Sequence, residues 1–170
     1  LLIVTATKEL FNTLFIDRVA CICEIYNIPT SLIVNKIDQQ GDEENLICEY
    51  ESVFTDHFRT NAKDINSLSE VVSFINNPKY QQIALTGMSG VGKSTILNQL
   101  IPSADARTSN VSHKTGQGVQ TTTMARAYQY NDKLLIDLPG IQSFGITELL
   151  AKEVRFGFPE IVEIGNSCKY

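Results

Sequence analysis

A glycine-rich segment at residues 85–95 has the residue types and the spacing of a loop that binds phosphate. It reads LTGMSGVGKST and matches the pattern G-x-x-x-x-G-K-[ST] at every fixed position. In this pattern backbone N–H groups surround phosphate oxygens, Lys93 reaches the β- and γ-phosphates, and Ser94 binds Mg²⁺. A glycine-rich turn before an ordinary helix is the alternative, which the complete match disfavours. The predicted nucleotide contacts are Gly87, Met88, Ser89, Gly90, Val91, Gly92, Lys93, Ser94 and Thr95.

The tetrapeptide Asn35-Lys36-Ile37-Asp38 follows an apolar run at 31–34 and is typical of guanine recognition. The Asp38 carboxylate would accept from the ring N1–H and the exocyclic amine of guanine, a donor pair that adenine lacks. Asn35 would help to hold the loop and the base, and the Lys36 stem would cover the face of the base. A polar turn with solvated charges is the alternative, but agreement with the phosphate loop favours a guanine nucleotide, GTP or GDP.

A weaker base-binding match follows at residues 60–63, which read Thr-Asn-Ala-Lys. GTPases often carry Ser-Ala-Lys after the guanine tetrapeptide, and the backbone of that segment contacts the base oxygen. Asn61 stands where the serine is usual. We therefore predict that Asn61 and Ala62 contact the base mainly because the segment follows the guanine tetrapeptide, and less because of its residue types.

Asp137-Leu138-Pro139-Gly140 follows another apolar run and completes a set of magnesium and γ-phosphate groups. An aspartate at this place holds Mg²⁺, usually through water, and the Gly140 N–H can bond the γ-phosphate. A threonine of 121–123 completes the metal site, and we choose Thr122. The alternative is that there is no metal site here: the threonines only begin a strand, and Asp-x-Pro-Gly is only a turn.

Alternating strand and helix patterns surround these groups and predict a three-layer α/β P-loop domain with about six mostly parallel strands. The expected strands are 1–4, 31–34, 57–59, 83–85, 125–130 and 133–136. The expected helices are 11–26, 42–54, 65–75 and the segment after the phosphate loop. The polar stretch 103–120 lacks periodicity, and so long a loop in a domain is usually functional.

Composition limits the classes of function. The chain has 170 residues and a net charge of −5, so no overall basic field favours nonspecific binding to nucleic acid or anionic membrane. It has no apolar run near the ~20 residues of a membrane span, and we expect no signal peptide. We expect a cytoplasmic monomer, cut from a longer protein, with no membrane partner. Cys21, Cys23 and Cys48 are predicted to be buried free thiols.

The motifs come in an unusual order, because Asn35-Lys36-x-Asp38 precedes the phosphate loop. In Ras-like proteins it comes last, and a circular permutation of the same sheet explains the difference. Together with segments 85–95, 116–123 and 136–145, this order resembles the circularly permuted GTPases of the small ribosomal subunit biogenesis family RsgA (YjeQ). The resemblance implies that 1–155 is the GTPase domain and that 156–170 begins a truncated zinc-binding module. Cys168 matches the first cysteine of that module and would be a zinc ligand in the intact protein.

The resemblance also implies slow GTP hydrolysis that is stimulated by the small ribosomal subunit, with that subunit and its rRNA as partners in late maturation. Two departures concern catalysis. Ile141 stands where Ras-like enzymes have a water-orienting glutamine. The family tends to carry a histidine before its threonines, whereas this chain has Gln120, which can orient a water but cannot act as a base. His113 is expected to be a solvated loop histidine. Lys93 and Gln120 are therefore the catalytic candidates.

Three other functions stay open at this point. A permuted GTPase that acts on the large subunit would share all the nucleotide motifs. A nucleotide-gated binding module that does not hydrolyse GTP is favoured by Ile141 and Gln120. A kinase that uses ATP would keep Lys93 and Ser94 but would need neither Asn35 nor Asp38.

Overall fold

A six-stranded sheet forms the centre of the molecule, with its strands in the order β3-β2-β1-β4-β6-β5. The computed structural model describes residues 1–39, 41, 43–104, 106, 124–140, 149 and 151–167. All strand pairs are parallel except β5 and β6, which form an antiparallel hairpin at one edge. The strands are β1 (Leu2–Ala6), β2 (Ser31–Asn35), β3 (His57–Arg59), β4 (Gln82–Thr86), β5 (Arg126–Tyr130) and β6 (Lys133–Asp137). The α-helices are α1 (Thr13–Ile25), α2 (Glu44–Val53), α3 (Ser69–Ile75), α4 (Lys93–Leu100), α5 (Ala151–Val154) and α6 (Pro159–Ser167). The 3-10 helices are η1 (Lys8–Leu10), η2 (Ile65–Leu68), η3 (Pro102–Ala104) and η4 (Arg155–Gly157).

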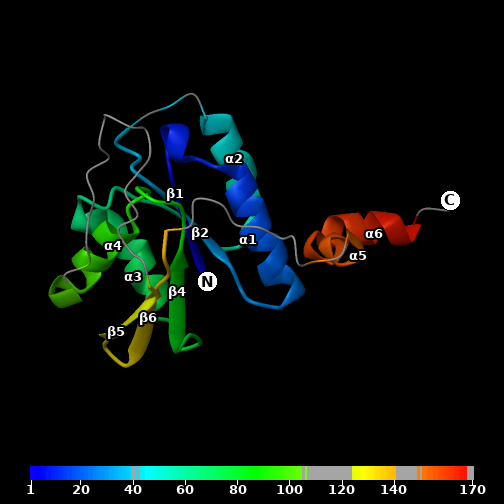
Figure 1. Cartoon of the computed structure of the whole chain (residues 1–170). Helices are drawn as coiled ribbons and strands as arrows, with labels where there is room; N and C mark the ends of the chain where they lie inside the picture. Colours follow the sequence, from blue (N-terminus) through cyan, green and yellow to red (C-terminus); the bar gives the residue numbers. More distant parts are fainter. Residues whose placement is uncertain are drawn as a thin grey trace.

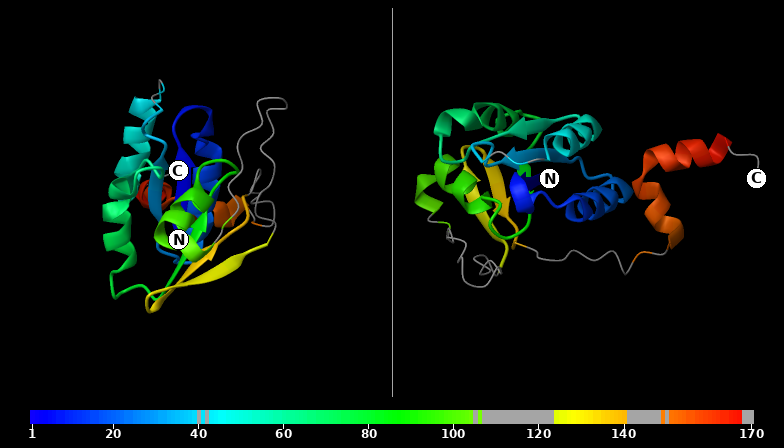
Figure 2. Two further views of the ribbon diagram at one scale, coloured as in Figure 1. Left: turned by 90° about the vertical axis from the view of Figure 1, so that its left-hand side faces the viewer. Right: turned by 90° about the horizontal axis from the view of Figure 1, so that it is seen from above.

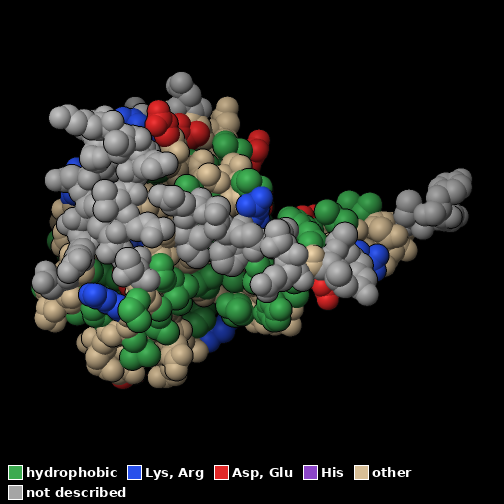
Figure 3. Space-filling model, in the orientation of Figure 1, with side chains coloured by type: hydrophobic (Ala, Val, Ile, Leu, Met, Phe, Trp, Pro, Cys, Tyr) green, Lys and Arg blue, Asp and Glu red, His purple; other side chains and the backbone are tan. Residues whose placement is uncertain are grey.

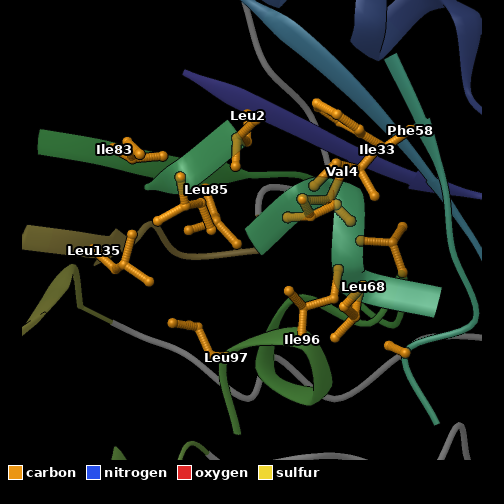
Figure 4. Close-up of a cluster of buried hydrophobic side chains, with 14 of the residues drawn as sticks. Leu2, Val4, Ile33, Phe58, Leu68, Ile83, Leu85, Ile96, Leu97 and Leu135 are labelled. Atoms are coloured by element: carbon orange, nitrogen blue, oxygen red, sulfur yellow. The ribbon is translucent and has the colours of Figure 1, made fainter. Parts of the chain in front are cut away.

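Helices cover both faces of the sheet, so the fold has the three layers that the sequence predicts (Figure 1 and Figure 2). In β1, Leu2 and Val4 belong to the core beneath α3 and α4, whereas Ile3 belongs to the core beneath α1 and α2. An apolar side chain at successive positions is what a strand needs when both of its faces are buried. Figure 4 shows the first of these cores, in which side chains of the sheet and of α4 point toward one another.

Helix α1 shows how local sequence sets the elements. It begins at Thr13 because the Asn12 side chain accepts a hydrogen bond from the Phe15 backbone N–H at 2.8 Å, which caps the helix. Phe15 and Val19 are buried against the sheet. Leu14 and Tyr26, which share the apolar periodicity of this segment, are exposed.

The carboxyl ends of the parallel strands meet at one edge of the sheet. Asn35 is the last residue of β2 and Asp137 the last of β6, and Thr86 ends β4 directly before the glycine-rich loop. β1 pairs with β2 on one side and with β4 on the other, so it joins the two halves of the sheet. The permuted order of motifs therefore still delivers them to a single edge.

Two expectations need correction. The segment 65–75 is not one continuous α-helix, because its first turn is the 3-10 helix η2. Cys21 and Cys23 are buried, as predicted, but Cys48 is exposed. On α2 the buried positions are Ile47 and Glu51, one turn apart, so the next residue, Cys48, turns away from the core. There its sulfur accepts a hydrogen bond from Arg59 Nη2 at 3.5 Å.

The last helices form a C-terminal arm, defined as α5, η4 and α6, that projects from the body (Figure 1 and Figure 2). The arm is attached through η4, where a Cβ on Gly157 would lie 2.3 Å from Cys21 Sγ and 2.7 Å from the Cys21 carbonyl oxygen. The Cys21 thiol also donates to the Val154 carbonyl at 3.6 Å. The boundary predicted between 155 and 156 falls within η4. Among the helices of the described ranges, none has the length and hydropathy to cross a membrane.

Candidate functional site

The phosphate loop has its predicted place between β4 and the start of α4. Gly92 ends the loop in the left-handed region at φ 106° and is the N-cap residue of α4. Ser94 and Thr95 lie half-buried in the first turn of α4, where the positive end of the helix dipole favours an anion. A strand, a glycine loop and a helix N-terminus are thus arranged as phosphate binding requires.

Gly87 allows the loop to leave β4 beside β1. A Cβ at Gly87 would lie 2.2 Å from the Val4 carbonyl oxygen, which belongs to the central strand and cannot move aside. The close approach of two backbones explains why only glycine fits at this position.

We expect Gly87→Ala to lower the free energy of unfolding by about 1–3 kcal/mol, because the added methyl overlaps backbone. Urea unfolding of the nucleotide-free protein measures the change. Gly165→Ala is the matched control, since a Cβ on this exposed glycine of α6 would meet nothing within 4 Å. That substitution should leave stability equal or raise it by about 0.5–1 kcal/mol. Equal effects of the two alanines would contradict the packing assigned to Gly87.

Lys93 is a buried cation at the mouth of the loop. Its side chain is 6% exposed, and Nζ donates to the carbonyl oxygens of Gly87 at 2.7 Å and Met88 at 3.0 Å. Burial lowers the pKa of Lys93 to about 8, although the negative charge of Asp137 opposes this shift. A phosphate group placed here would supply the negative charge that the buried ammonium lacks.

Asn35 connects the base tetrapeptide to the phosphate loop. Its side chain is 2% exposed, and Nδ2 donates to the Val91 carbonyl at 2.8 Å. Its Oδ1 accepts from the Ala62 N–H at 2.9 Å and from the Thr60 hydroxyl at 3.1 Å. Gly92 packs so closely that a Cβ there would lie 2.1 Å from Asn35 Nδ2.

These contacts divide the predicted base-binding residues by role. Asn35 and Ala62 bond to each other, so the Asn35 side chain holds the 60–63 loop beside the tetrapeptide. Asn61 also shapes the loop, because its Oδ1 accepts from the Lys63 N–H at 3.2 Å and its own N–H donates to Ser67 Oγ at 2.9 Å. Asp38 is exposed at the rim.

Lys36 lies between the loops in a conformation that is uncommon for a side chain of its size, with φ 61°. The Thr7 hydroxyl, just after β1, donates to the Lys36 carbonyl at 2.8 Å and helps to fix this conformation. Burial and the nearby Lys63 lower the pKa of Lys36, while Asp38 opposes the shift. The amphipathic stem of this half-buried lysine suits the face of a planar base.

Sequence analysis did not predict Thr7 as part of this site, and within the matched 60–63 segment it assigned no role to Thr60 or Lys63. Thr60 is fully buried and bonds to Asn35, Thr7 bonds to Lys36, and Lys63 lies near Lys36. Their positions could have indicated a role, because Thr7 and Thr60 directly follow the carboxyl ends of β1 and β3. Ligands in such sheets bind at the carboxyl ends of the strands.

Asp137 and Gly140 lie on the far side of the phosphate loop from Asn35. Asp137 is 1% exposed and pairs in register with Leu85 of β4. A Cβ on Gly140 would lie 3.2 Å from Ser89 Cα and 3.4 Å from Lys93 Nζ, so this turn lies against the loop. The Ser94 hydroxyl and the Asp137 carboxylate are the oxygen ligands that Mg²⁺ prefers, and together they fit a bound Mg²⁺–nucleotide.

The remaining predicted groups lie outside the described residues. They are Gln120 and Thr122 of the loop before β5, His113, Ile141 after the Asp137 motif, and the zinc candidate Cys168. Within the described ranges no group of three or more His, Cys, Asp or Glu side chains could hold a metal ion.

Known proteins that are similar to this chain are GTPases, in agreement with the nucleotide site described above. The family model described as "RsgA GTPase" matches residues 1–147. The "Small ribosomal subunit biogenesis GTPase RsgA 2" of Bacteroides thetaiotaomicron is 32% identical over 177 residues, covering 100% of this chain and 56% of that protein. The RsgA protein of Porphyromonas gingivalis is 33% identical over 178 residues, covering 99% of this chain and 56% of that protein. This chain therefore spans little more than half the length of these curated relatives.

Solved structures show the same fold. YjeQ from Thermotoga maritima has a TM-score of 0.69 and 24% identity, covering 94% of this chain and 54% of that one. YloQ, described as a circularly permuted GTPase, has a TM-score of 0.67 and 25% identity, covering 99% of this chain and 54% of that one. The family model, the relatives and the fold agree, and the chain belongs to the RsgA GTPase family.

Proposed function

We propose that this chain is the part of a small-subunit maturation factor that binds GTP and hydrolyses it slowly. The observation that carries the proposal is Asn35, whose side chain joins the guanine tetrapeptide, the 60–63 loop and the phosphate loop into one site. Membership in the RsgA GTPase family supports the same reaction. The relatives are named as small ribosomal subunit biogenesis GTPases, which supports that subunit as the particle that matures.

The residues divide the work of nucleotide recognition. Asp38 reads the guanine edge, the Lys36 stem covers the base, and the loop 87–95 holds the phosphates. Ser94 and Asp137, with Thr122, hold Mg²⁺, which neutralises charge on the phosphate oxygens when it is bound. Lys93 adds a cation that is already desolvated, and Gly140 brings a backbone N–H toward the γ-phosphate.

We expect slow hydrolysis in the isolated protein because neither residue at the two usual water-positioning places can act as a general base. Ile141 stands at the position of the Ras glutamine, and Gln120 can orient a water without taking its proton. The small subunit and its rRNA raise the rate by ordering these loops, since catalysis of this type depends on positioning and charge.

The test is GTP turnover by the whole natural protein, alone and with purified small ribosomal subunits. Large subunits serve as the control particle. Strong stimulation by small subunits alone is the expected result. Tight GTP binding without turnover under any condition would favour the nucleotide-gated binding module instead. Stimulation only by large subunits, or a preference for ATP, would overturn the proposal.

Ser94→Ala should weaken the Mg²⁺ dependence of GTP binding by about 10- to 100-fold, because it removes one oxygen ligand. Titration of Mg²⁺ at fixed GTP measures the effect. Ser73→Ala, at an exposed position of α3, is the matched serine control and should behave like the parent. A Ser94 variant with the same Mg²⁺ dependence as the parent would remove this residue from the metal site.

The zinc module and the cellular setting complete the proposal. Residues 1–155 form the GTPase domain, and 156–170 begin a zinc-binding module in which Cys168 is one ligand. The family resemblance supports this boundary and this ligand. The protein acts as a cytoplasmic monomer. Zinc analysis of the whole protein, with Cys168→Ser as the variant, tests the ligand, and light scattering tests the monomer.

A further inference from the structure

A groove of about 830 Å³ lies at the edge of the sheet opposite the nucleotide site. It is lined by Thr30, Asp56 and Tyr80, which precede β2, β3 and β4, so it faces the amino ends of the strands. The nucleotide site lies at their carboxyl ends. The groove therefore belongs to a surface that GTP binding does not use.

Three elements form the walls of this groove. Helix α1 contributes Ile16 and Cys21, the end of α2 contributes Tyr50 and Val53, and the C-terminal arm contributes Phe158. Figure 3 shows hydrophobic side chains gathered where the arm leaves the body. Val53 is 75% exposed although it is apolar, so the structure leaves hydrophobic surface open to water here.

Most of the charged side chains around this apolar surface are negative. Five carboxylates line the groove, against a single ammonium group, Lys79. The carboxylates belong to Asp17, Glu24, Glu49, Asp56 and Glu160. Asp17 accepts a hydrogen bond from the Tyr50 hydroxyl at 2.7 Å, and no ion pair within the described residues involves the other four. We call this site the acidic groove.

Helix ends add to the negative potential. The C-termini of α1 and α2 both lie beside the acidic groove, and neither helix has a basic residue in its last turn. The C-terminal end of a helix carries partial negative charge and favours a cation. Two kinds of charge, from side chains and from backbone, therefore act in the same direction.

We propose that the acidic groove docks a cationic segment of a protein partner, in which Lys or Arg side chains flank an aromatic or aliphatic anchor. The anchor covers the apolar surface around Val53 and Phe158, and the flanking cations meet Glu24, Glu49 and Asp56. RNA and anionic lipid would be repelled by the same carboxylates. A second copy of this chain has a net charge of −5 and is also a poor match.

The arm and α1 form opposite walls of the acidic groove and are in contact with each other. The arm follows the Asp137 motif in the chain, and its place against α1 is set by Gly157 on Cys21. A partner that binds both α1 and the arm favours this arrangement of the arm over others.

The test uses the whole natural protein and a short fluorescent peptide of alternating Lys and Leu around a central Phe. Its counterpart, with Glu in place of every Lys, is the peptide control. The variant Glu24→Gln with Glu49→Gln removes two groove charges, and Glu9→Gln with Glu70→Gln removes two exposed charges elsewhere. All of these side chains are exposed, so each pair of substitutions leaves the fold intact.

We expect saturable binding of the cationic peptide that weakens about tenfold in the groove variant and with added salt. The control variant should bind like the parent, and the anionic peptide should not bind. Equal binding by the two variants, no saturable binding, or displacement of the peptide by an RNA oligonucleotide would overturn the proposal. GTP turnover is measured in parallel and should not change, so loss of peptide binding alone would leave the proposed GTPase function untouched.

Discussion

Asp38→Asn should lower the affinity for GTP by about a thousandfold and make a xanthine nucleotide the preferred ligand. The carboxylate accepts two hydrogen bonds from guanine, and an amide cannot accept both while its NH₂ faces the amine of the base. Xanthine carries a carbonyl in place of that amine, so it can accept from the new amide. Competition among GTP, XTP and ATP for a fluorescent nucleotide measures the change in preference.

Asp64→Asn is the matched control for this prediction. Asp64 is exposed, and its side chain caps η2 through the Asn66 N–H at 3.0 Å, a role that asparagine fills equally well. The control should keep the guanine preference of the parent. If Asp38→Asn also kept it, Asp38 would not contact the base.

Lys93→Met should weaken GDP and GTP binding by about a thousandfold, because the cation that meets the β- and γ-phosphates is lost. The nucleotide-free protein should become equally stable or more stable. Burial lowers the pKa of Lys93 from 10.5 to about 8, which corresponds to a destabilisation on the order of 3 kcal/mol at neutral pH. Methionine fills a similar volume without this desolvated charge, so binding and stability change in opposite directions.

The pH dependence of stability tests the same residue. Between pH 8 and 10.5 the unfolded chain holds the Lys93 proton more tightly than the folded chain does. The free energy of unfolding of the parent therefore rises with pH across that window relative to that of Lys93→Met. The stability advantage of the methionine variant should shrink as the pH rises. Denaturant unfolding of both proteins at several pH values measures the difference.

Lys133→Met is the control for the effect on nucleotide binding. Lys133 is also buried, at 3% exposed, and also donates to two carbonyls, those of Asn77 at 2.8 Å and Tyr80 at 2.6 Å. It lies at the opposite edge of the sheet, so its loss should leave nucleotide binding unchanged. Similar losses of affinity in the two variants would show a general effect on folding instead of a role at the phosphates.

Most elements of the fold follow from local patterns in the sequence. The short strand β3 was predicted at the residues where it occurs, and the loop 87–93 was placed between a strand and a helix. These features depend on neighbouring residues, such as the apolar run before the loop and the glycines within it. The order of the motifs indicated the circular permutation, because Asn35-Lys36-x-Asp38 precedes the phosphate loop in the chain.

The contacts that complete the site could not be predicted in the same way. The hydrogen bond from Asn35 to Val91 joins residues 56 positions apart, and Thr60 meets Asn35 only because β2 and β3 pair. Cys48 was misplaced because its residue type favours burial, whereas the register of α2 turns it to Arg59. Such contacts depend on how strands pair and on how helices are turned toward the sheet. Short sequence motifs carry little information about either.

The strand order has a consequence for how the chain folds as it is synthesised. The half of the sheet that carries the base tetrapeptide, β3-β2-β1, is complete in sequence before Gln82, where β4 begins. Because synthesis proceeds from the N-terminus, this half can emerge from the ribosome as an incomplete intermediate while the phosphate loop is still being made. Until β4 emerges, β1 has an open edge with unpaired backbone groups, which is a hazard for mispairing with other nascent strands. Nucleotide cannot stabilise this early intermediate, since the groups that hold the phosphates have yet to be made.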